Sequence, residues 1–308
     1  MSDTYDVIII GGGPAGLTAG IYTARDRHKT LLLEKGICGG LPSSTDLIEN
    51  YPGFSSGVNG TELIAKFKEQ AVRFGVNIAE SAQVQKVESK QSLFKCHTSK
   101  ETFTAKTVIV ASGSIPKHLN IPKEKELQGQ GVSYCATCDG PLYRGKDVAV
   151  IGCGNSGLQE GEALLKHVNS ITFIEFLPKI SAEKILEDRI RKNSNVEFLL
   201  NHQLIAINGN DMVSSVTVAQ RDSGEIKDIN VSGVFIYIGF VPNSKFLEGV
   251  VELDKQGYVI VNNKMQTGIS GLYAAGDVCS KDVRQITVAC GEATVAAISA
   301  GQYLRTLL

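Results

Sequence analysis

Residues 5–24 read YDVIIIGGGPAGLTAGIYTA, and this stretch decides the fold. Its first part, residues 5–10, is rich in β-branched residues and is typical of a buried strand. The strand ends abruptly in Gly11-Gly12-Gly13-Pro14-Ala15-Gly16, and residues 17–24 have helical spacing. A second apolar strand over 30–33 ends at Glu34, 18 residues after Gly16. Strand, glycine turn, helix, strand and terminal acid together form the fingerprint of a dinucleotide-binding unit.

The same pattern returns later in the chain. Residues 147–151 form an apolar strand that runs into Gly152-Cys153-Gly154-Asn155-Ser156-Gly157. We expect a helix over 158–167 and a strand over 171–174 that ends at Glu175, again 18 residues after Gly157. A single motif of this kind also occurs in glycine-rich turns that bind no ligand. Two complete copies predict two nucleotide-type sites in one chain.

The segments between and after the two copies indicate how the chain is divided. Residues 107–113 predict a buried strand that ends on small residues, and residues 234–239 predict its counterpart in the second unit. Each is followed by a segment with a proline, residues 114–117 and 240–244, which we interpret as interdomain linkers. We therefore expect an α/β protein with two Rossmann-like, three-layer ββα domains, the second inserted into the first. The first domain would comprise 1–115 and 245–308, and the second 116–244.

Length and composition restrict the function classes. The 308 residues carry 31 Lys and Arg against 32 Asp and Glu, with 43% hydrophobic residues and a mean hydropathy of +0.01. A net charge of −1 gives no basic field for nucleic acid or an anionic membrane. Apolar runs such as 7–10 are far below the roughly 18 residues of a spanning helix, and the first residues include Asp3 and Asp6 rather than a basic signal region. We expect a cytoplasmic protein with no nucleic-acid or membrane partner.

The first glycine turn has a defined chemistry. Gly11, Gly13 and Gly16 let the backbone turn tightly and bring a helix N-terminus against a pyrophosphate, while Glu34 would accept hydrogen bonds from ribose hydroxyls. Near the C-terminus, residues 271–278 predict a strand that ends in Gly-Asp, with Asp277 placed to bind the ribityl chain of FAD. Without the first glycine turn, we would interpret Asp277 as a helix cap or a turn residue. Together with the first turn it favours FAD over NAD.

Cys135-Ala136-Thr137-Cys138-Asp139 is the chemically distinctive cysteine cluster among seven cysteines. A CxxC pair can cycle between dithiol and disulfide, and Asp139 is placed to manage the proton of the departing thiol. The alternative is half of a zinc site, but no second CxxC and no His pair at ligand spacing accompanies it. We expect the histidines at the surface and the other cysteines to be small buried residues or free thiols. These are His28, His97, His118, His167 and His202, and Cys38, Cys96, Cys153, Cys279 and Cys290.

These motifs closely resemble one family, the low-molecular-weight flavoprotein thioredoxin reductases, and the resemblance covers essentially the whole chain. It is carried by the first glycine turn, by residues 49–54 (ENYPGF), 111–113 (ASG) and 135–140 (CATCDG), and by 276–278 (GDV) followed by Arg284-Gln285. The CATCDG segment is the most specific of these, because related flavin disulfide reductases place their cysteine pair in the first domain.

The resemblance implies a site and partners. Cys138 would face the flavin, Cys135 would attack the disulfide of thioredoxin, and Asp139 would act as acid and base. Family members are homodimers whose two domains rotate against each other, so that the pair meets the flavin in one state and thioredoxin in the other. FAD would be held by Gly11, Gly13, Pro14, Ala15, Gly16, Glu34, Gly40, Asn50, Ala111, Gly113, Gly276, Asp277, Arg284, Gln285 and Ile286.

The chain departs from the family where the electron donor would be recognised. NADPH-using members follow the second strand of the second unit with a basic His-Arg-Arg segment and a further arginine, whereas residues 174–179 read IEFLPK here. Because Glu175 would repel a 2′-phosphate, NADPH is not expected as donor. We favour reduced ferredoxin, as in nicotinamide-independent relatives, over NADH, whose ribose diol Glu175 could bind. A flavin-bound thiol sensor without turnover is the competing class. The family's aromatic pair after CATCDG is also replaced, by Pro141-Leu142-Tyr143.

Overall fold

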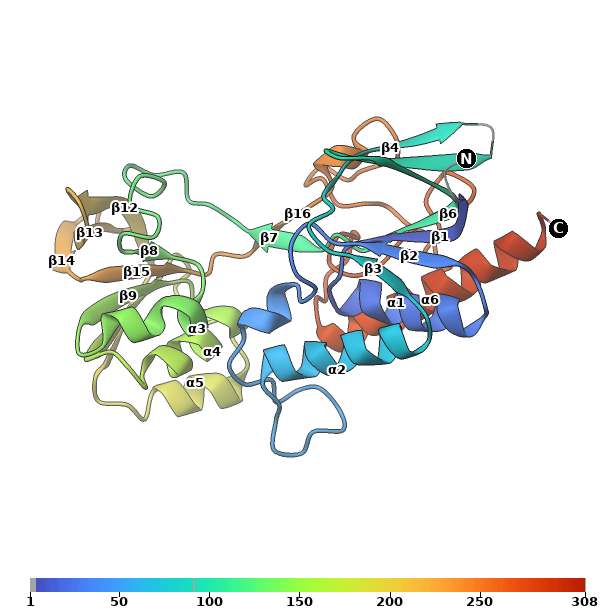
Figure 1. Ribbon diagram of the computed structural model, residues 1–308. Coiled ribbons are helices and arrows are strands. Elements are labelled where there is room, and N and C mark those ends of the chain that lie inside the picture. The colour runs from blue at the N-terminus through green and yellow to red at the C-terminus, as the bar shows by residue number, and fades with distance from the viewer. Residues whose placement is uncertain (1–3, 91, 308) are drawn as a thin grey trace. The chain divides into compact units, whose positions relative to one another are not determined.

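The computed structural model describes residues 4–90 and 92–307. Contacts divide the chain into two compact units (Figure 1). The first unit contains the residues up to Ile115 and those from Val241 onward, and the second contains Pro116–Phe240. The return crossing therefore lies at Phe240–Val241 rather than at 244–245. No helix within the described residues is long and apolar enough to cross a membrane.

The first unit is built on a mainly parallel sheet that carries helices. The strands run in the order β3-β2-β1-β6-β5-β4, and β17 also pairs with β6. The pairs among β3, β2, β1, β6 and β17 are parallel, whereas β5 and β4 are antiparallel. The elements are β1 (Thr4–Ile10), α1 (Pro14–Arg25), β2 (Thr30–Leu33), η1 (Leu41–Ser44), α2 (Gly60–Arg73), β3 (Asn77–Ala79), β4 (Val84–Lys90), β5 (Leu93–Thr98), β6 (Thr102–Val110), η3 (Lys245–Leu247), β17 (Leu272–Ala274) and α6 (Ile286–Arg305).

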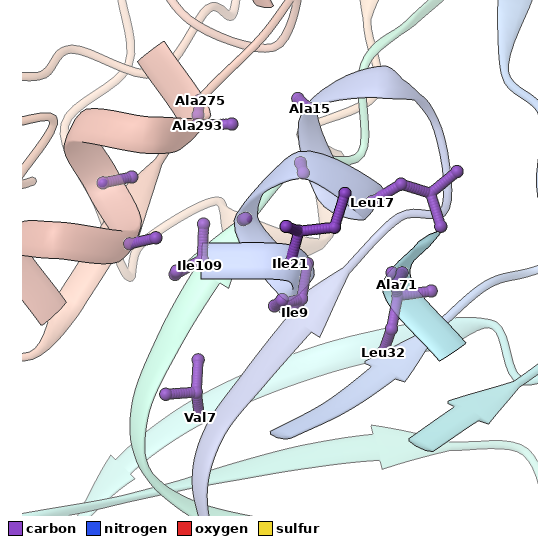
Figure 2. Close-up of a cluster of buried hydrophobic side chains, with 14 of the residues drawn as sticks. Val7, Ile9, Ala15, Leu17, Ile21, Leu32, Ala71, Ile109, Ala275 and Ala293 are labelled. Atoms are coloured by element: carbon purple, nitrogen blue, oxygen red, sulfur yellow. The ribbon is translucent and has the colours of Figure 1, made fainter. Parts of the chain in front are cut away.

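Alternation along β1 explains why this sheet is covered on both faces. Val7 and Ile9 pack into a core with α1, α2 and α6, as Figure 2 shows around Ile9, Ile21 and Leu17. Ile8 and Ile10 point to the opposite face and pack into a second core with β4 and β5. Because successive side chains of a strand point to opposite faces, the apolar run 7–10 requires a layer on each side.

The second unit repeats this arrangement. Its parallel sheet runs β11-β10-β9-β15-β8, and a separate antiparallel sheet runs β12-β13-β14. Val148 and Val150 of β9 pack toward α4 and α5, whereas Ala149 and Ile151 pack toward β12 and β13. The elements are β8 (Val132–Ser133), α3 (Ala136–Asp139), η2 (Gly140–Tyr143), β9 (Asp147–Ile151), α4 (Asn155–Leu164), β10 (Ser170–Glu175), α5 (Lys184–Ile190), β11 (Val196–Leu200), β12 (His202–Gly209), β13 (Val213–Gln220), β14 (Ile226–Asn230) and β15 (Gly233–Ile236).

The predicted fold class, two three-layer α/β units of the dinucleotide-binding type, is confirmed, and some local boundaries differ. Helix α4 begins at Asn155 rather than at 158, because Gly154 is its N-cap and the helix starts inside the glycine turn. The expected linkers contain short strands, β7 (Ser114–Pro116) and β16 (Phe240–Pro242), which pair with each other. Each proline lies at the end of its strand, where a missing N–H group is tolerated.

Two helix glycines provide a matched test of the packing. A Cβ at Gly161 of α4 would lie 2.4 Å from the ring of fully buried Phe173, whereas a Cβ at Gly291 of α6 would meet nothing within 4 Å. We expect Gly161→Ala to destabilise the protein by about 1–3 kcal/mol through overpacking. Gly291→Ala should stabilise it by up to about 1 kcal/mol, because alanine is the better helix former. Differential scanning calorimetry of both variants tests this, and a shift of the same sign in both would contradict it.

Candidate functional site

The first glycine turn holds helix α1 against backbone atoms. Gly11 has a φ of +110°, and a Cβ there would lie 2.3 Å from the carbonyl oxygen of Ala111 at the end of β6. A Cβ at Gly16 would lie 1.8 Å from the carbonyl oxygen of Gly11. Neither position can carry a side chain in this arrangement. Gly13 is the N-cap of α1 and supplies no side-chain cap, so the first N–H groups of the helix are left for a ligand.

Glu34 is fixed beside this turn at the end of β2. Its Oε2 accepts a hydrogen bond from the Gly12 N–H at 2.7 Å, and its Oε1 accepts one from the Gly36 N–H at 2.9 Å. Gly40 follows in the same loop, and a Cβ there would lie 3.2 Å from Cα of Gly13. Because a carboxylate offers about four acceptor positions, Glu34 keeps acceptor capacity for ligand hydroxyls while its orientation is set by the backbone.

Asp277 reaches the same edge from the far end of the chain. The Ala275 N–H donates to the Val110 carbonyl at 2.9 Å, and a Cβ at Gly276 would lie 2.8 Å from Cβ of Ala15. Burial raises the pKa of the Asp277 carboxyl, although Lys281 and Arg284 oppose the shift. Within residues 4–90 and 92–307, no hydrogen bond to its carboxylate is formed. A partly buried carboxylate with this acceptor capacity suits a polyhydroxyl chain.

Further expected residues meet near the start of α6. The Asn50 side chain donates to Oε1 of Gln285 at 3.2 Å, across 235 residues of sequence. The Arg284 guanidinium lies 4.2 Å from the centre of the Tyr258 ring, and its buried Nε has no hydrogen-bond partner in the part of the chain that the structure describes. Ile286 packs against the small core of Ile48, Val58 and Leu63. Helix α6 thus begins among residues that sequence reasoning assigned to one cofactor.

The structure therefore places every residue expected at the FAD site in the first unit. Gly113 has a φ of +67°, and its carbonyl accepts from the Asn243 N–H at 3.0 Å, which fixes the chain just after Ala111. The residues fit FAD on three observations: an open helix N-terminus, a carboxylate with acceptor capacity at Asp277 and an unpartnered Nε at Arg284.

The cysteine pair lies in the second unit. Cys135 and Cys138 form a disulfide bond, and Cys135 is the N-cap of the short helix α3. The Cys138 N–H donates to Sγ of Cys135 at 3.1 Å. Cys138 is exposed and Cys135 is half-buried. A backbone N–H aimed at a sulfur stabilises negative charge on it, and here that sulfur belongs to Cys135.

Two side chains that sequence reasoning missed hold this segment. Ser133 Oγ donates to Oδ2 of Asp139 at 2.6 Å and accepts from the Cys135 N–H at 3.0 Å. The Tyr237 hydroxyl accepts from the Ala136 N–H at 2.9 Å. Ser133 lies only two residues before Cys135, so its position was a usable signal. Tyr237 comes from the end of another strand, and no local pattern connects it to the pair.

Of the five histidines expected at the surface, His118 is exposed, and His28, His97, His167 and His202 are half-buried. Nδ1 of His167 is buried and has no hydrogen-bond partner among the described residues, and a Cβ at Gly140 would lie 3.5 Å from its ring. The chain around Gly140, directly after the redox pair, covers this ring. The helical position of His167 in the sequence gave no indication of that cover.

The second glycine turn has nearly the same geometry as the first. A Cβ at Gly152 would lie 2.2 Å from the Tyr237 carbonyl oxygen, and one at Gly157 would lie 2.0 Å from the Gly152 carbonyl oxygen. Buried Glu175 accepts from the Cys153 N–H at 2.6 Å and from the Leu177 N–H at 2.9 Å. Glu175 thus occupies the position in the second unit that Glu34 has in the first.

The segment after Glu175 contacts Arg221, an arginine that the sequence analysis did not predict to lie there. The Arg221 guanidinium, from the turn between β13 and β14, lies 3.7 Å from the centre of the Phe176 ring. It donates to the Phe176 carbonyl at 3.1 Å and to Oδ1 of Asn201 at 3.3 Å. Its charge is therefore already engaged by an aromatic face and two oxygens of its own unit.

The five cysteines outside the pair lie in surroundings that make their thiols poor nucleophiles. Cys38, Cys96, Cys153 and Cys279 are buried, and Cys290 is half-buried. Burial raises the pKa of Cys38, Cys96 and Cys279 to about 12, and it also raises the pKa of Cys153 and Cys290. No group of three or more His, Cys, Asp or Glu side chains that could hold a metal ion is found within the part of the chain that the structure describes.

Comparison with known proteins agrees with this geometry. Residues 5–293 match the family of pyridine nucleotide-disulphide oxidoreductases. The chain is 41% identical over 304 residues to thioredoxin reductase of Bacillus subtilis, covering 98% of this chain and 96% of that protein. The crystal structure of thioredoxin reductase from Lactococcus lactis matches with a TM-score of 0.96 at 38% identity, over 98% of this chain and 100% of that one.

A third similarity is to a protein whose name includes the electron carrier ferredoxin. A ferredoxin-flavin thioredoxin reductase from Clostridium acetobutylicum is 30% identical, with a TM-score of 0.54 over 99% of both chains. The two glycine turns, the CxxC pair and these similarities agree with one another. The chain belongs to the pyridine nucleotide-disulphide oxidoreductases and, within them, to the low-molecular-weight thioredoxin reductase family, whose members are FAD flavoproteins.

Proposed function

We propose that this protein reduces the disulfide of thioredoxin, with Cys135 and Cys138 as the redox-active pair and FAD as the cofactor. The observation that carries the proposal is the disulfide between these cysteines, with the Asp139 carboxylate anchored immediately beside it. The relatives named thioredoxin reductase match this chain over nearly its whole length. Both the site and the similarities favour an oxidoreductase that acts on a protein disulfide.

The first unit supplies the residues that would hold FAD. The N-terminus of α1 would face its pyrophosphate, and Glu34 would bind its adenosine ribose. Asp277 would bind the ribityl chain, and the buried Nε of Arg284 would donate a hydrogen bond to the cofactor. When bound, FAD supplies a carrier that takes up two electrons and passes them to a disulfide.

The cysteines and Asp139 have different tasks in this proposal. Cys138 receives the electrons from the flavin side, and Cys135 attacks the thioredoxin disulfide. The hydrogen bond from the Cys138 N–H to Sγ of Cys135 supports the second role, because it favours the thiolate, the attacking form, at Cys135. Asp139 moves the proton of the departing thiol. The cysteine pair lies in one unit and the residues expected to hold the flavin lie in the other. We therefore propose that the two units are domains that rotate against each other during turnover. We also propose that the protein is a homodimer.

We further propose that the electron donor is not NADPH and that reduced ferredoxin is favoured over NADH. Glu175 is buried at the end of β10, and the following Phe176 and Leu177 offer no cation to a 2′-phosphate. Arg221 lies against this segment, and its charge is engaged by Phe176 and Asn201. NADH remains the alternative, because the second turn keeps its glycine geometry and Glu175 matches an acid that binds a ribose diol.

The redox pair can be tested by single substitutions. We expect Cys135→Ser and Cys138→Ser each to abolish thioredoxin reduction, because neither leaves a pair that can form the disulfide. Both variants should remain yellow, since the FAD residues lie in the other unit. Turnover with thioredoxin and the flavin absorbance are the measurements, and Cys290→Ser is the matched control. Full activity in either pair variant would contradict the mechanism.

The donor can be tested by anaerobic rapid mixing of the oxidised holoenzyme with NADPH, NADH or reduced ferredoxin. We expect ferredoxin to bleach the flavin band fastest and NADPH to be ineffective, because of the charge at Glu175. Rapid bleaching by NADPH would overturn the proposal, and its loss in Arg221→Ala would assign the 2′-phosphate to Arg221. Bleaching by NADH that is lost in Glu175→Ala would select the NADH alternative.

Thiol reactivity should separate the pair from the other cysteines. A thiol with a pKa of about 12 is ionised at pH 8 in only about one molecule in ten thousand, so Cys38, Cys96 and Cys279 should resist alkylation in the native protein. We expect iodoacetamide to label Cys135 and Cys138 rapidly after reduction and not before. Mass spectrometry of the labelled peptides measures this. Fast labelling of Cys38, Cys96 or Cys279 in the folded, oxidised protein would be inconsistent with their burial.

A further inference from the structure

We propose that Ser133 is a positioning residue for proton transfer at the redox pair: its hydroxyl holds the Asp139 carboxylate in place to move that proton. This inference rests on the proposed function, in which Asp139 is the acid and base. It adds Ser133, whose side chain takes no part in the reaction itself. That side chain determines where the Asp139 carboxylate lies.

The surroundings of Ser133 hold its hydroxyl between the backbone of Cys135 and the Asp139 carboxylate. Ser133 is 3% exposed and lies on β8, where it pairs with Phe235 of β15 in the parallel sheet. Its Oγ accepts from the Cys135 N–H at 3.0 Å and donates to Oδ2 of Asp139 at 2.6 Å, a much shorter contact than the 3.3 Å to its other acceptor, the Cys135 carbonyl. A short hydrogen bond to an ionised carboxylate is among the stronger ones in proteins. The sheet therefore positions Ser133, and Ser133 positions Asp139.

The hydrogen bond also selects which carboxylate oxygen is left for chemistry. Oδ2 is held by Ser133, and no hydrogen bond to Oδ1 is formed among the residues that the structure describes. The Asp139 N–H donates to the Cys135 carbonyl at 3.1 Å, so the backbone of Asp139 is fixed as well. Oδ1 is the oxygen that takes up and releases the proton.

The reaction that this arrangement serves balances without a further reactant. Cys135 gives its proton to Asp139, its thiolate bonds to one sulfur of the substrate disulfide, the substrate S–S bond breaks, and the leaving thiolate takes that proton from Asp139. Cys138 then loses its proton and attacks Sγ of Cys135, which re-forms the enzyme disulfide and releases the second substrate thiol. Two electrons and two protons pass from the enzyme dithiol to the substrate. Asp139 accepts the proton of Cys138 and delivers it to a departing thiolate.

Matched variants separate positioning from a general structural role. Ser133→Ala removes the hydroxyl, and Ser133→Thr keeps it on a side chain suited to a strand. Asp139→Asn removes the acid. Tyr237→Phe is the structural control, because it deletes a hydrogen bond to the neighbouring Ala136 N–H and leaves the Ser133–Asp139 contact in place.

The experiment mixes the dithionite-reduced holoenzyme with oxidised thioredoxin and follows formation of the thioredoxin dithiol at several concentrations. We expect Ser133→Ala to lower the limiting rate about 10-fold, part of the 10²–10⁴-fold that acid and base catalysis supplies, with half-saturation unchanged. Ser133→Thr should restore the rate to within about 2-fold of wild type. In the Asp139→Asn background, Ser133→Ala should have no further effect, whereas Tyr237→Phe should retain an effect, because the hydrogen bond that it deletes is made to the Ala136 N–H.

Two results would overturn the inference: a wild-type rate in Ser133→Ala, or an undiminished effect of Ser133→Ala in the Asp139→Asn background. The second would show that Ser133 acts only through the backbone of Cys135. The same variants are assayed with 5,5′-dithiobis(2-nitrobenzoic acid) as a small disulfide. If the wild type reduces this compound but not thioredoxin, the proposed substrate fails, while the comparison between Ser133 and Asp139 still decides the positioning role.

Discussion

Both units depend on a helix that begins directly on the backbone of a glycine turn. In the first unit the carbonyl oxygen of Gly11 lies where any side chain at Gly16 would have to be, and in the second unit Gly152 and Gly157 repeat this contact. Such an approach is possible only without a Cβ, so the glycines cannot be exchanged while the helix stays where it is. The open N–H groups of α1, the acid at the end of β2 and the strand that delivers Asp277 are all placed relative to this contact.

The two turns share a geometry but differ in how the space around them is filled. Gly12 has no side chain, and a Cβ there would lie 2.6 Å from Sγ of Cys38, which comes from the following loop. In the second unit the corresponding residue is Cys153, and its own side chain is fully buried. A cysteine sulfur thus fills the interior beside each turn, from a different element each time. Cys38 and Cys153 therefore act as packing residues, in keeping with their raised pKa values.

The local sequence patterns predicted the two dinucleotide-binding units and the cysteine pair. They did not predict side chains that tertiary contacts bring to these sites. The glycine spacing and the acids at Glu34 and Glu175 gave the two units, and the apolar strands gave their layers, because these patterns follow from the periodicity of strands and helices. The CxxC pair was recognisable by its chemistry. Tyr237, Arg221 and the cover over His167 were not predicted, because each is brought to its place by an element far away in the chain. Helix α4 was expected three residues late because the glycines of its first turn concealed its start.

Tyr237 belongs to two parts of the second unit at once. Its N–H donates to the Ile151 carbonyl at 2.8 Å and its own carbonyl borders Gly152, while its hydroxyl supports the first residue of the cysteine helix at Ala136. The glycine turn is thus part of the scaffold on which the redox cysteines rest. Selection for thiol chemistry alone would then preserve the turn, whatever supplies the electrons. The glycine turn of this unit therefore has a structural task beneath the redox pair in addition to any contact with a nucleotide.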